Sequence, residues 1–164
     1  TSKGGKTMKL SEIYLKEIQM TQDIIKRMST NSFFIKGGVL TLASASLIHD
    51  NSASTYSVFT DIATIFLIVL FWWLDAYYLR QERLYRVLMC WFTKHRDDSD
   101  HTHLFDFNTS RVNDAVESHV RVMKSSPLRE LYILLLLMSI CKLCMDIEFC
   151  MIVKKLIRCL LSYA

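Results

Sequence analysis

Apolar residues fill three stretches of this chain, and polar residues separate them. The longest, residues 56–79, runs for 24 residues and holds only two charged side chains, Asp61 and Asp75. At about 1.5 Å per residue, a helix of this length can cross a hydrocarbon core of about 30 Å. Trp72, Trp73, Tyr77 and Tyr78 lie where the stretch ends, as an aromatic belt at a membrane interface would. The pattern predicts a transmembrane helix; the alternative is a buried helix of a soluble bundle.

A shorter apolar stretch, residues 33–48, precedes the long one. Its one charge, Lys36, can reach a membrane interface while its alkyl chain stays in lipid. Seven Lys or Arg residues lie in residues 1–36 and nine in residues 80–129, but none lies in residues 37–79. Because positive residues gather on the cytoplasmic side of membrane segments, residues 33–79 are predicted to form a transmembrane hairpin with both ends in the cytoplasm.

The segments on either side of the hairpin are predicted to be cytoplasmic. Residues 1–32 hold an amphipathic helix over residues 9–32, which we expect to end at the polar run Ser29–Ser32. Residues 80–127 form the second cytoplasmic region. There the helix continues to about Lys94, and after a polar break a further helix runs from Thr109 or Ser110 to Lys124.

The C-terminal segment, residues 128–164, begins after Pro127, which suits a first helical turn. Its apolar part is interrupted by Lys142 and Asp146, which are four residues apart and can neutralise each other. We expect a third span here, although it places Lys154 and Lys155 outside. A surface-lying or re-entrant helix is the alternative. The predicted fold class is therefore an all-α integral membrane protein with two transmembrane helices, a third span, and cytoplasmic amphipathic helices.

The composition agrees with long helices and offers little for catalysis. Apolar residues make up 51% of the chain, with one Pro and four Gly, and the net charge of +4 is too small to indicate nucleic-acid binding. Five cysteines argue against an extracellular disulfide scaffold. Cys141 and Cys144 form a CxxC without the two further ligands of a zinc site. Gly5-Lys6-Thr7 lacks the rest of a phosphate-binding loop. No cofactor or metal is predicted.

One dense group of His and Asp residues lies in the polar break after Lys94. Its spacing matches no metal-ligand signature, so a solvated connector is the favoured interpretation and a membrane enzyme the less favoured one. We predict that the chain is not an enzyme. The group consists of His95, Asp97, Asp98, Asp100, His101, His103 and Asp106.

The charges inside the apolar stretches are the strongest functional candidates, because a charge in a membrane segment is expensive. Lys36 lies about three residues inside the first predicted span and Asp75 about four residues inside the end of the second. In an antiparallel hairpin these depths coincide, so we expect Lys36 and Asp75 to pair, within one subunit or between neighbours. Separate contact of each with water is the alternative. Asp61 has no matching cation, and it is a candidate for a pore mouth or an interface marker.

Residues 71–86, FWWLDAYYLRQERLYR, resemble the exit of the second span in a group of small bacterial inner-membrane proteins. Asn31-Ser32-Phe33 and Lys36-Gly37 resemble the entry to their first span, although Gly38 stands where an aromatic residue is expected. The resemblance covers about residues 9–124. Similar proteins include the Hailong and cyclic-oligonucleotide types of antiphage membrane effector. In those systems a partner nucleotidyltransferase makes a nucleotide or oligonucleotide signal, and the membrane protein depolarises the cell.

Two functions from different classes are predicted. The first is an oligomeric, ligand-gated ion channel or pore in the cell inner membrane, because two or three spans are too few to enclose a pore in one chain. Gly37, Ala43 and Ser44, together with the N-terminal helix, are expected to form the contact between subunits. The second is a non-conducting membrane anchor or adaptor that recruits a cytosolic partner.

An anionic ligand of the channel is expected to bind cytoplasmic cations. The same cations could instead face lipid headgroups. The candidates are Arg80, Arg83, Arg86, Lys94, Arg96 and Arg111.

Overall fold

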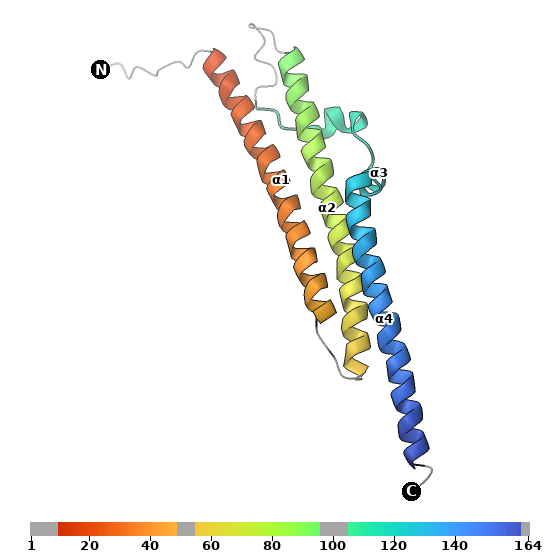
Figure 1. The fold of residues 1–164 in the computed structure, drawn as a ribbon. Coiled ribbons are helices and arrows are strands. Elements are labelled where there is room, and N and C mark those ends of the chain that lie inside the picture. The colour runs from red at the N-terminus through yellow and green to blue at the C-terminus, as the bar shows by residue number, and fades with distance from the viewer. Residues whose placement is uncertain (1–9, 49–54, 96–104, 162–164) are drawn as a thin grey trace, which may run out of the picture.

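The computed structural model describes residues 10–48, 55–95 and 105–161. Every regular element in these ranges is a helix, which confirms the all-helical prediction (Figure 1). The elements are α1 (Leu10–Ile48), α2 (Thr55–His95), the 3-10 helix η1 (Thr109–Ala115), α3 (His119–Met123) and α4 (Ser126–Leu161).

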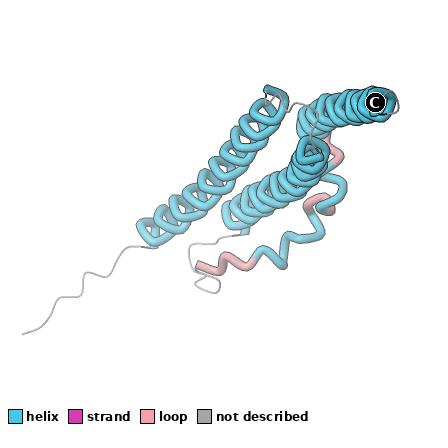
Figure 2. The backbone as a smooth tube through the Cα atoms, turned by 90° about the horizontal axis from the view of Figure 1, so that it is seen from below, coloured by secondary structure: helices cyan, strands magenta, loops and turns pink. Residues whose placement is uncertain are grey.

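The three long helices are arranged around α2. Figure 1 shows α1 and α2 as an antiparallel pair. It also shows α4 beside the N-terminal half of α2, with its C-terminal end extending past the N-terminal end of α2. The contacts of α1 and α4 are mostly with α2 and only slightly with each other. The short elements η1 and α3 pack on α2 as well, and Figure 2 shows this layout along the bundle.

The predicted break at Ser29–Ser32 is wrong, because α1 is continuous from Leu10 to Ile48. Serine disrupts a helix chiefly when its hydroxyl competes for backbone groups. Here the Ser32 hydroxyl donates to Asp75 of α2 instead, and Ser32 is buried. Helix α2 runs from Thr55 to His95, which confirms the prediction that the helix of the second apolar stretch continues past residue 80 to about Lys94.

The single helix predicted from Thr109 or Ser110 to Lys124 is also wrong. Two short elements replace it, separated by extended residues at Val116 and Ser118. The first is capped by Asn108, whose side-chain oxygen accepts the Ser110 N–H at 3.0 Å. The Arg80 side chain donates to the Glu117 carbonyl at 3.2 Å, which satisfies a backbone group in the break. Contacts with α2 thus take the place of helical hydrogen bonds.

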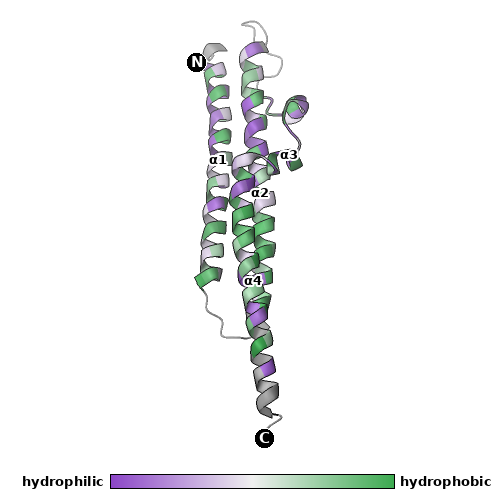
Figure 3. Ribbon diagram, turned by 45° about the vertical axis from the view of Figure 1, so that its right-hand side comes forward, coloured by the Kyte–Doolittle hydropathy of each residue, from purple (hydrophilic) through white to green (hydrophobic). Residues whose placement is uncertain are grey.

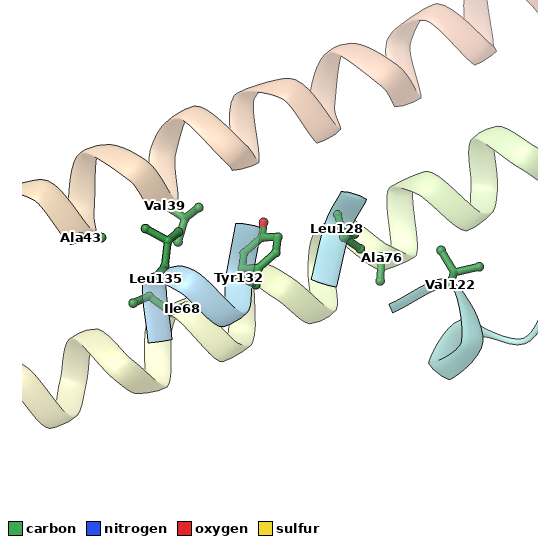
Figure 4. Close-up of a cluster of buried hydrophobic side chains, with 8 residues drawn as sticks. All are labelled: Val39, Ala43, Ile68, Ala76, Val122, Leu128, Tyr132 and Leu135. Atoms are coloured by element: carbon green, nitrogen blue, oxygen red, sulfur yellow. The ribbon is translucent and has the colours of Figure 1, made fainter. Parts of the chain in front are cut away.

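Two clusters of buried apolar side chains hold these elements together. The smaller joins α2 to η1 and consists of Leu84, Leu88, Phe92 and Val112. The larger joins the four α-helices, and Figure 4 shows its side chains between them. It consists of Val39, Ala43, Ile68, Ala76, Val122, Leu128, Tyr132 and Leu135.

The exposed surface of the long helices carries many large apolar side chains. The ranges Glu12–Ile48 and Val58–Lys94 are long and apolar enough to cross a membrane, yet only 17% and 22% of their most apolar windows are buried. The core helix of a soluble protein would be mostly buried. Phe33, Phe59 and Phe66 are 72%, 71% and 67% exposed. Figure 3 shows hydrophobic residues dominating the C-terminal half of α1 and the N-terminal half of α2.

Replacing Ile68 with Ala should destabilise the bundle by about 2–5 kcal/mol, because a fully buried side chain leaves a cavity between helices. Ile62 lies on the same helix but is 53% exposed, so Ile62→Ala is the matched control and should have a much smaller effect. Unfolding of the purified protein in mild detergent measures both. Equal losses for the two variants would contradict the packing described here.

Candidate functional site

Asp75 is the point at which the three long helices meet. Its side chain, on α2, is fully buried. From α1, the Lys36 ammonium lies 2.8 Å from Oδ1 and 2.8 Å from Oδ2, and the Ser32 hydroxyl donates to Oδ1. From α4, the Tyr132 hydroxyl donates to Oδ2 at 3.1 Å. The structure therefore brings Lys36 and Asp75 together within one subunit, and both carboxylate oxygens have donors.

The spacing of residues on α1 explains half of this arrangement. Ser32 and Lys36 are four residues apart, so they lie on the same face of the helix, toward α2. The Lys36 ammonium also donates to the Ser32 hydroxyl at 2.6 Å. Sequence reasoning missed Ser32, although its position one turn from Lys36 was an available signal.

Tyr132 was missed as well, although a tyrosine inside a leucine-rich run signals a hydroxyl that needs a partner when buried. Its ring stacks on Trp72, with centroids 5.8 Å apart and planes at 4°. The Trp72 indole N–H donates to the Met123 carbonyl at 3.1 Å, which fixes the end of α3. Trp72 therefore lies between elements of the bundle, whereas Trp73 and Tyr77 are about half exposed.

A second buried ion pair joins α2 to α4 nearer the hairpin turn. The Lys142 ammonium lies 2.5 Å from Asp61 Oδ1 and 3.4 Å from Asp146 Oδ2. Asp61 is 3% exposed. The expectation that Asp61 has no matching cation is therefore wrong. Its partner comes from a distant helix, and no spacing in the sequence indicates that contact.

Four of the predicted ligand-binding cations are bonded to groups of the subunit itself. Arg80 donates to Asn113 Oδ1 at 2.6 Å as well as to the Glu117 carbonyl, and Arg83 pairs with the Glu117 carboxylate at 2.9 Å. The other two pairs are Arg86 with Glu82 at 2.7 Å and Arg111 with Asp106 at 3.0 Å.

Three predicted cations meet at a cleft of about 480 Å³ between α2 and η1. The Arg111 guanidinium carbon lies 5.6 Å from the centre of the Trp91 ring, as in a cation–π contact. Arg86 also lines a neighbouring cleft of about 420 Å³ between α1 and α2. Arg96 lies outside the described residues. The larger cleft is lined by Arg86, Val87, Cys90, Trp91, Lys94, Arg111, Val112 and Ala115.

The other sequence candidates do not assemble into a reactive centre in the part of the chain that the structure describes. No group of three or more His, Cys, Asp or Glu side chains lies close enough there to hold a metal ion. Most of the His and Asp cluster falls in residues 96–104, outside the described residues. Cys141 and Cys144 are exposed free thiols on α4.

One of the three residues that were predicted to form the contact between subunits is not available for it. Ala43 is 2% exposed and packs inside its own subunit, so its assignment to an outer small-residue face is wrong. The register of α1 against α2, set by the Asp75 contacts, turns Ala43 inward. Gly37 and Ser44 do lie on the exposed side, and a methyl group added at Gly37 would meet nothing within 4 Å.

Comparison with protein-family models, with curated proteins and with solved structures finds no match to this chain.

Lys36 and Asp75 should be energetically coupled. Lys36→Leu and Asp75→Ala each leave an unpaired polar group, so each should destabilise the protein. The loss should stay below the about 3–5 kcal/mol typical of a broken buried pair, because the Lys36 side chain is 34% exposed. The double variant should recover part of it. A double-mutant cycle in detergent measures the coupling, and strictly additive effects would contradict it.

The hydroxyl of Tyr132 should contribute separately from its ring. Tyr132→Phe keeps the stacking on Trp72 but removes a donor to a buried carboxylate, and should cost about 1.5–3 kcal/mol. Tyr77→Phe makes the same change at a residue that is 42% exposed, and should be nearly neutral. If thermal unfolding finds both variants as stable as the wild type, Tyr132 does not help to hold α4 on the hairpin.

Proposed function

We propose that this chain is one subunit of an oligomeric membrane protein that forms a ligand-gated ion channel or pore. The observation that carries the proposal is the pair of buried ion pairs, Lys36–Asp75 and Asp61–Lys142, inside helices that expose many large apolar side chains. A membrane anchor needs only an apolar helix. Ionisable residues inside such helices are expensive and usually serve a transport or signalling function.

The separation of the two ion pairs fits a bilayer. Asp61 and Asp75 are fourteen residues apart on α2, which is about 21 Å along a helix. Centred in a hydrocarbon core of about 30 Å, each carboxylate would lie about 5 Å inside the boundary. Lysine can reach the interface from that depth, in agreement with the partial exposure of Lys36.

Helix α4 fits the proposal as a third span. It meets Asp75 through Tyr132 and Asp61 through Lys142, so it passes both levels beside α2. This placement puts Lys154 and Lys155 on the outer side, against the tendency of positive residues to stay inside. The far more numerous Lys and Arg residues of the N-terminal and central segments would dominate the orientation.

Three helices are too few to enclose a pore, so several copies would surround it. The exposed side of α1, which includes Gly37 and Ser44, remains the favoured contact between copies. From the resemblance to antiphage effectors, we further propose that the protein lies in the inner membrane. Its signal would be made by a partner nucleotidyltransferase.

The cleft between α2 and η1 is the favoured place for that signal. Trp91 follows Asp75 by sixteen residues, or about 24 Å along α2, which is beyond the lipid headgroups in the proposed orientation. A soluble anion, rather than a lipid headgroup, could therefore enter. Cations beside an indole ring suit an anion that also carries an aromatic ring, such as a nucleotide.

One observation favours a non-conducting anchor or adaptor as the second candidate. Arg80, Arg83 and Arg86 are already bonded to acceptors of their own subunit, so a ligand would have to compete for them. In an adaptor these contacts would simply fix a rigid cytoplasmic surface that a protein partner binds.

Conductance separates the two candidates. The purified wild-type protein should have a mass in mild detergent several times that of the 19.2 kDa chain, and should give discrete current steps in planar bilayers. Lys36→Leu should reduce the fraction of assembled protein or the current, whereas Asp114→Asn changes an exposed carboxylate and should leave both unchanged. A monomer in several mild detergents that gives no current would contradict the channel and favour the adaptor.

A further inference from the structure

The cleft of about 420 Å³ between α1 and α2 collects polar side chains that have no partner in the subunit. They are spaced by three or four residues around Lys26, so they share one face of α1, toward α2. Among the described residues, none makes a side-chain hydrogen bond or ion pair with these side chains, so their polar groups remain available to a ligand. The α1 residues concerned are Gln22, Lys26, Ser29 and Thr30.

Arg86 lines the cleft from α2, and a largely buried carboxylate holds its guanidinium in place. Its Nε and Nη2 atoms donate to Glu82 Oε1 at 2.9 Å and 2.7 Å. The Glu82 side chain is 12% exposed, whereas that of Arg86 is 61% exposed. A guanidinium has five N–H groups, of which Glu82 takes two, so three remain for a ligand. Such a positioned arginine suits an oxyanion.

The charges of the lining select an anion with a single negative charge. Glu82 neutralises Arg86, and no Asp or Glu is among the described residues that line the cleft. The Lys26 ammonium is therefore the one unbalanced charge of this lining. A phosphodiester carries one negative charge on oxygen atoms that accept hydrogen bonds, so it matches both the charge and the donors. The lining has no aromatic ring, so a nucleotide base has nothing to stack on there, in contrast to the cleft that contains Trp91.

One end of the cleft reaches the level of the lipid headgroups in the proposed orientation. Thr30 precedes Lys36 by six residues, or about 9 Å along α1. With the Lys36–Asp75 pair about 5 Å inside the hydrocarbon core, Thr30 lies about 4 Å outside it, within a headgroup layer of about 5–7 Å. Gln22, at the other end of the cleft, is eight residues farther from the membrane. A lipid phosphate can therefore enter at the Thr30 end.

We propose that this cleft binds a phosphodiester monoanion that an anionic phospholipid of the cytoplasmic leaflet supplies. The Lys26 ammonium neutralises the phosphate, and Arg86, Ser29 and Thr30 donate hydrogen bonds to its oxygen atoms. The site differs from the cleft proposed for the signal, and its depth rests on the proposed membrane orientation. A lipid held there fastens the cytoplasmic part of the α1–α2 hairpin to the membrane surface.

Native mass spectrometry of the purified wild-type protein in mild detergent, titrated with phosphatidylglycerol, tests the site. Binding should be saturable, and phosphatidylcholine should bind more weakly because its choline group already balances its phosphate. Lys26→Gln should weaken phosphatidylglycerol binding about tenfold, because it removes a hydrogen bond between charged groups. Arg27→Gln removes the same charge from the next residue, which is exposed and does not line the cleft, and should not change the binding.

A further variant separates direct contact from general attraction between charges. The double change Ser29→Ala with Thr30→Val removes two hydroxyls and leaves every charge in place. It should weaken phosphatidylglycerol binding several-fold while the helical circular dichroism is unchanged. Equal weakening by Lys26→Gln and Arg27→Gln would overturn the site in favour of diffuse attraction. Absence of saturable binding to the folded wild type would overturn it as well.

Soluble glycerophosphoglycerol, which is the same headgroup without acyl chains, distinguishes a lipid from a free phosphodiester. Weaker binding than that of phosphatidylglycerol supports a site for a lipid. Equal or tighter binding would overturn the lipid as the source and assign the cleft to a soluble phosphodiester.

The failure of this site and of the channel can be told apart, because the titration needs no current. Saturable, Lys26-dependent lipid binding without bilayer current would leave the site in place and remove the channel. Current without such binding would leave the channel and remove the site.

Discussion

The buried Asp75 carboxylate needs hydrogen-bond donors, and this need determines how the three long helices pack against one another. Among the described residues, the donors to Asp75 come from α1 and α4, and none comes from α2 itself. Leaving such a charge unpaired costs several kcal/mol, more than most single packing contacts contribute. The contact with Ser32 and Lys36 fixes the register of α1 against α2, and the contact with Tyr132 fixes the height of α4.

The two buried ion pairs differ in what they require of α4. Asp75 would keep Lys36 and Ser32 if α4 moved away, and Lys142 would keep Asp146, four residues along its own helix. Asp61 alone would lose its cation. Helices α1 and α2 alone thus supply a cation for Asp75, but the cation for Asp61 comes from α4. A movement of α4 relative to α2 would therefore act first on Asp61, whose Oδ2 has no hydrogen-bond partner among the described residues.

The sequence was informative wherever a contact follows from position along one or two adjacent helices. Depth within two neighbouring apolar stretches was enough to pair Lys36 with Asp75, and a spacing of four was enough to pair Lys142 with Asp146. It was uninformative about Asp61 and Lys142, because their meeting depends on how a third helix docks. It was misleading at Ser32, where the hydroxyl donates to Asp75 of α2 and the helix continues although the polar run predicted a break. It was also misleading between η1 and α3, where Arg80 of α2 donates to the Glu117 carbonyl and the chain leaves the helix that was predicted there.

In the proposed orientation, the apolar surface between the two ion pairs lies in lipid. Cys90 and Cys141 are both exposed on the bundle, but Cys90 lies beyond Asp75 on α2 and Cys141 lies beside Lys142 on α4. Two variants that each retain one of these cysteines, reconstituted in lipid nanodiscs and treated with a membrane-impermeant maleimide, test it most directly. We predict that Cys90 reacts rapidly, and that Cys141 reacts only after the lipid is dissolved. Equal and rapid labelling of both thiols in intact nanodiscs would show that this surface does not lie in lipid.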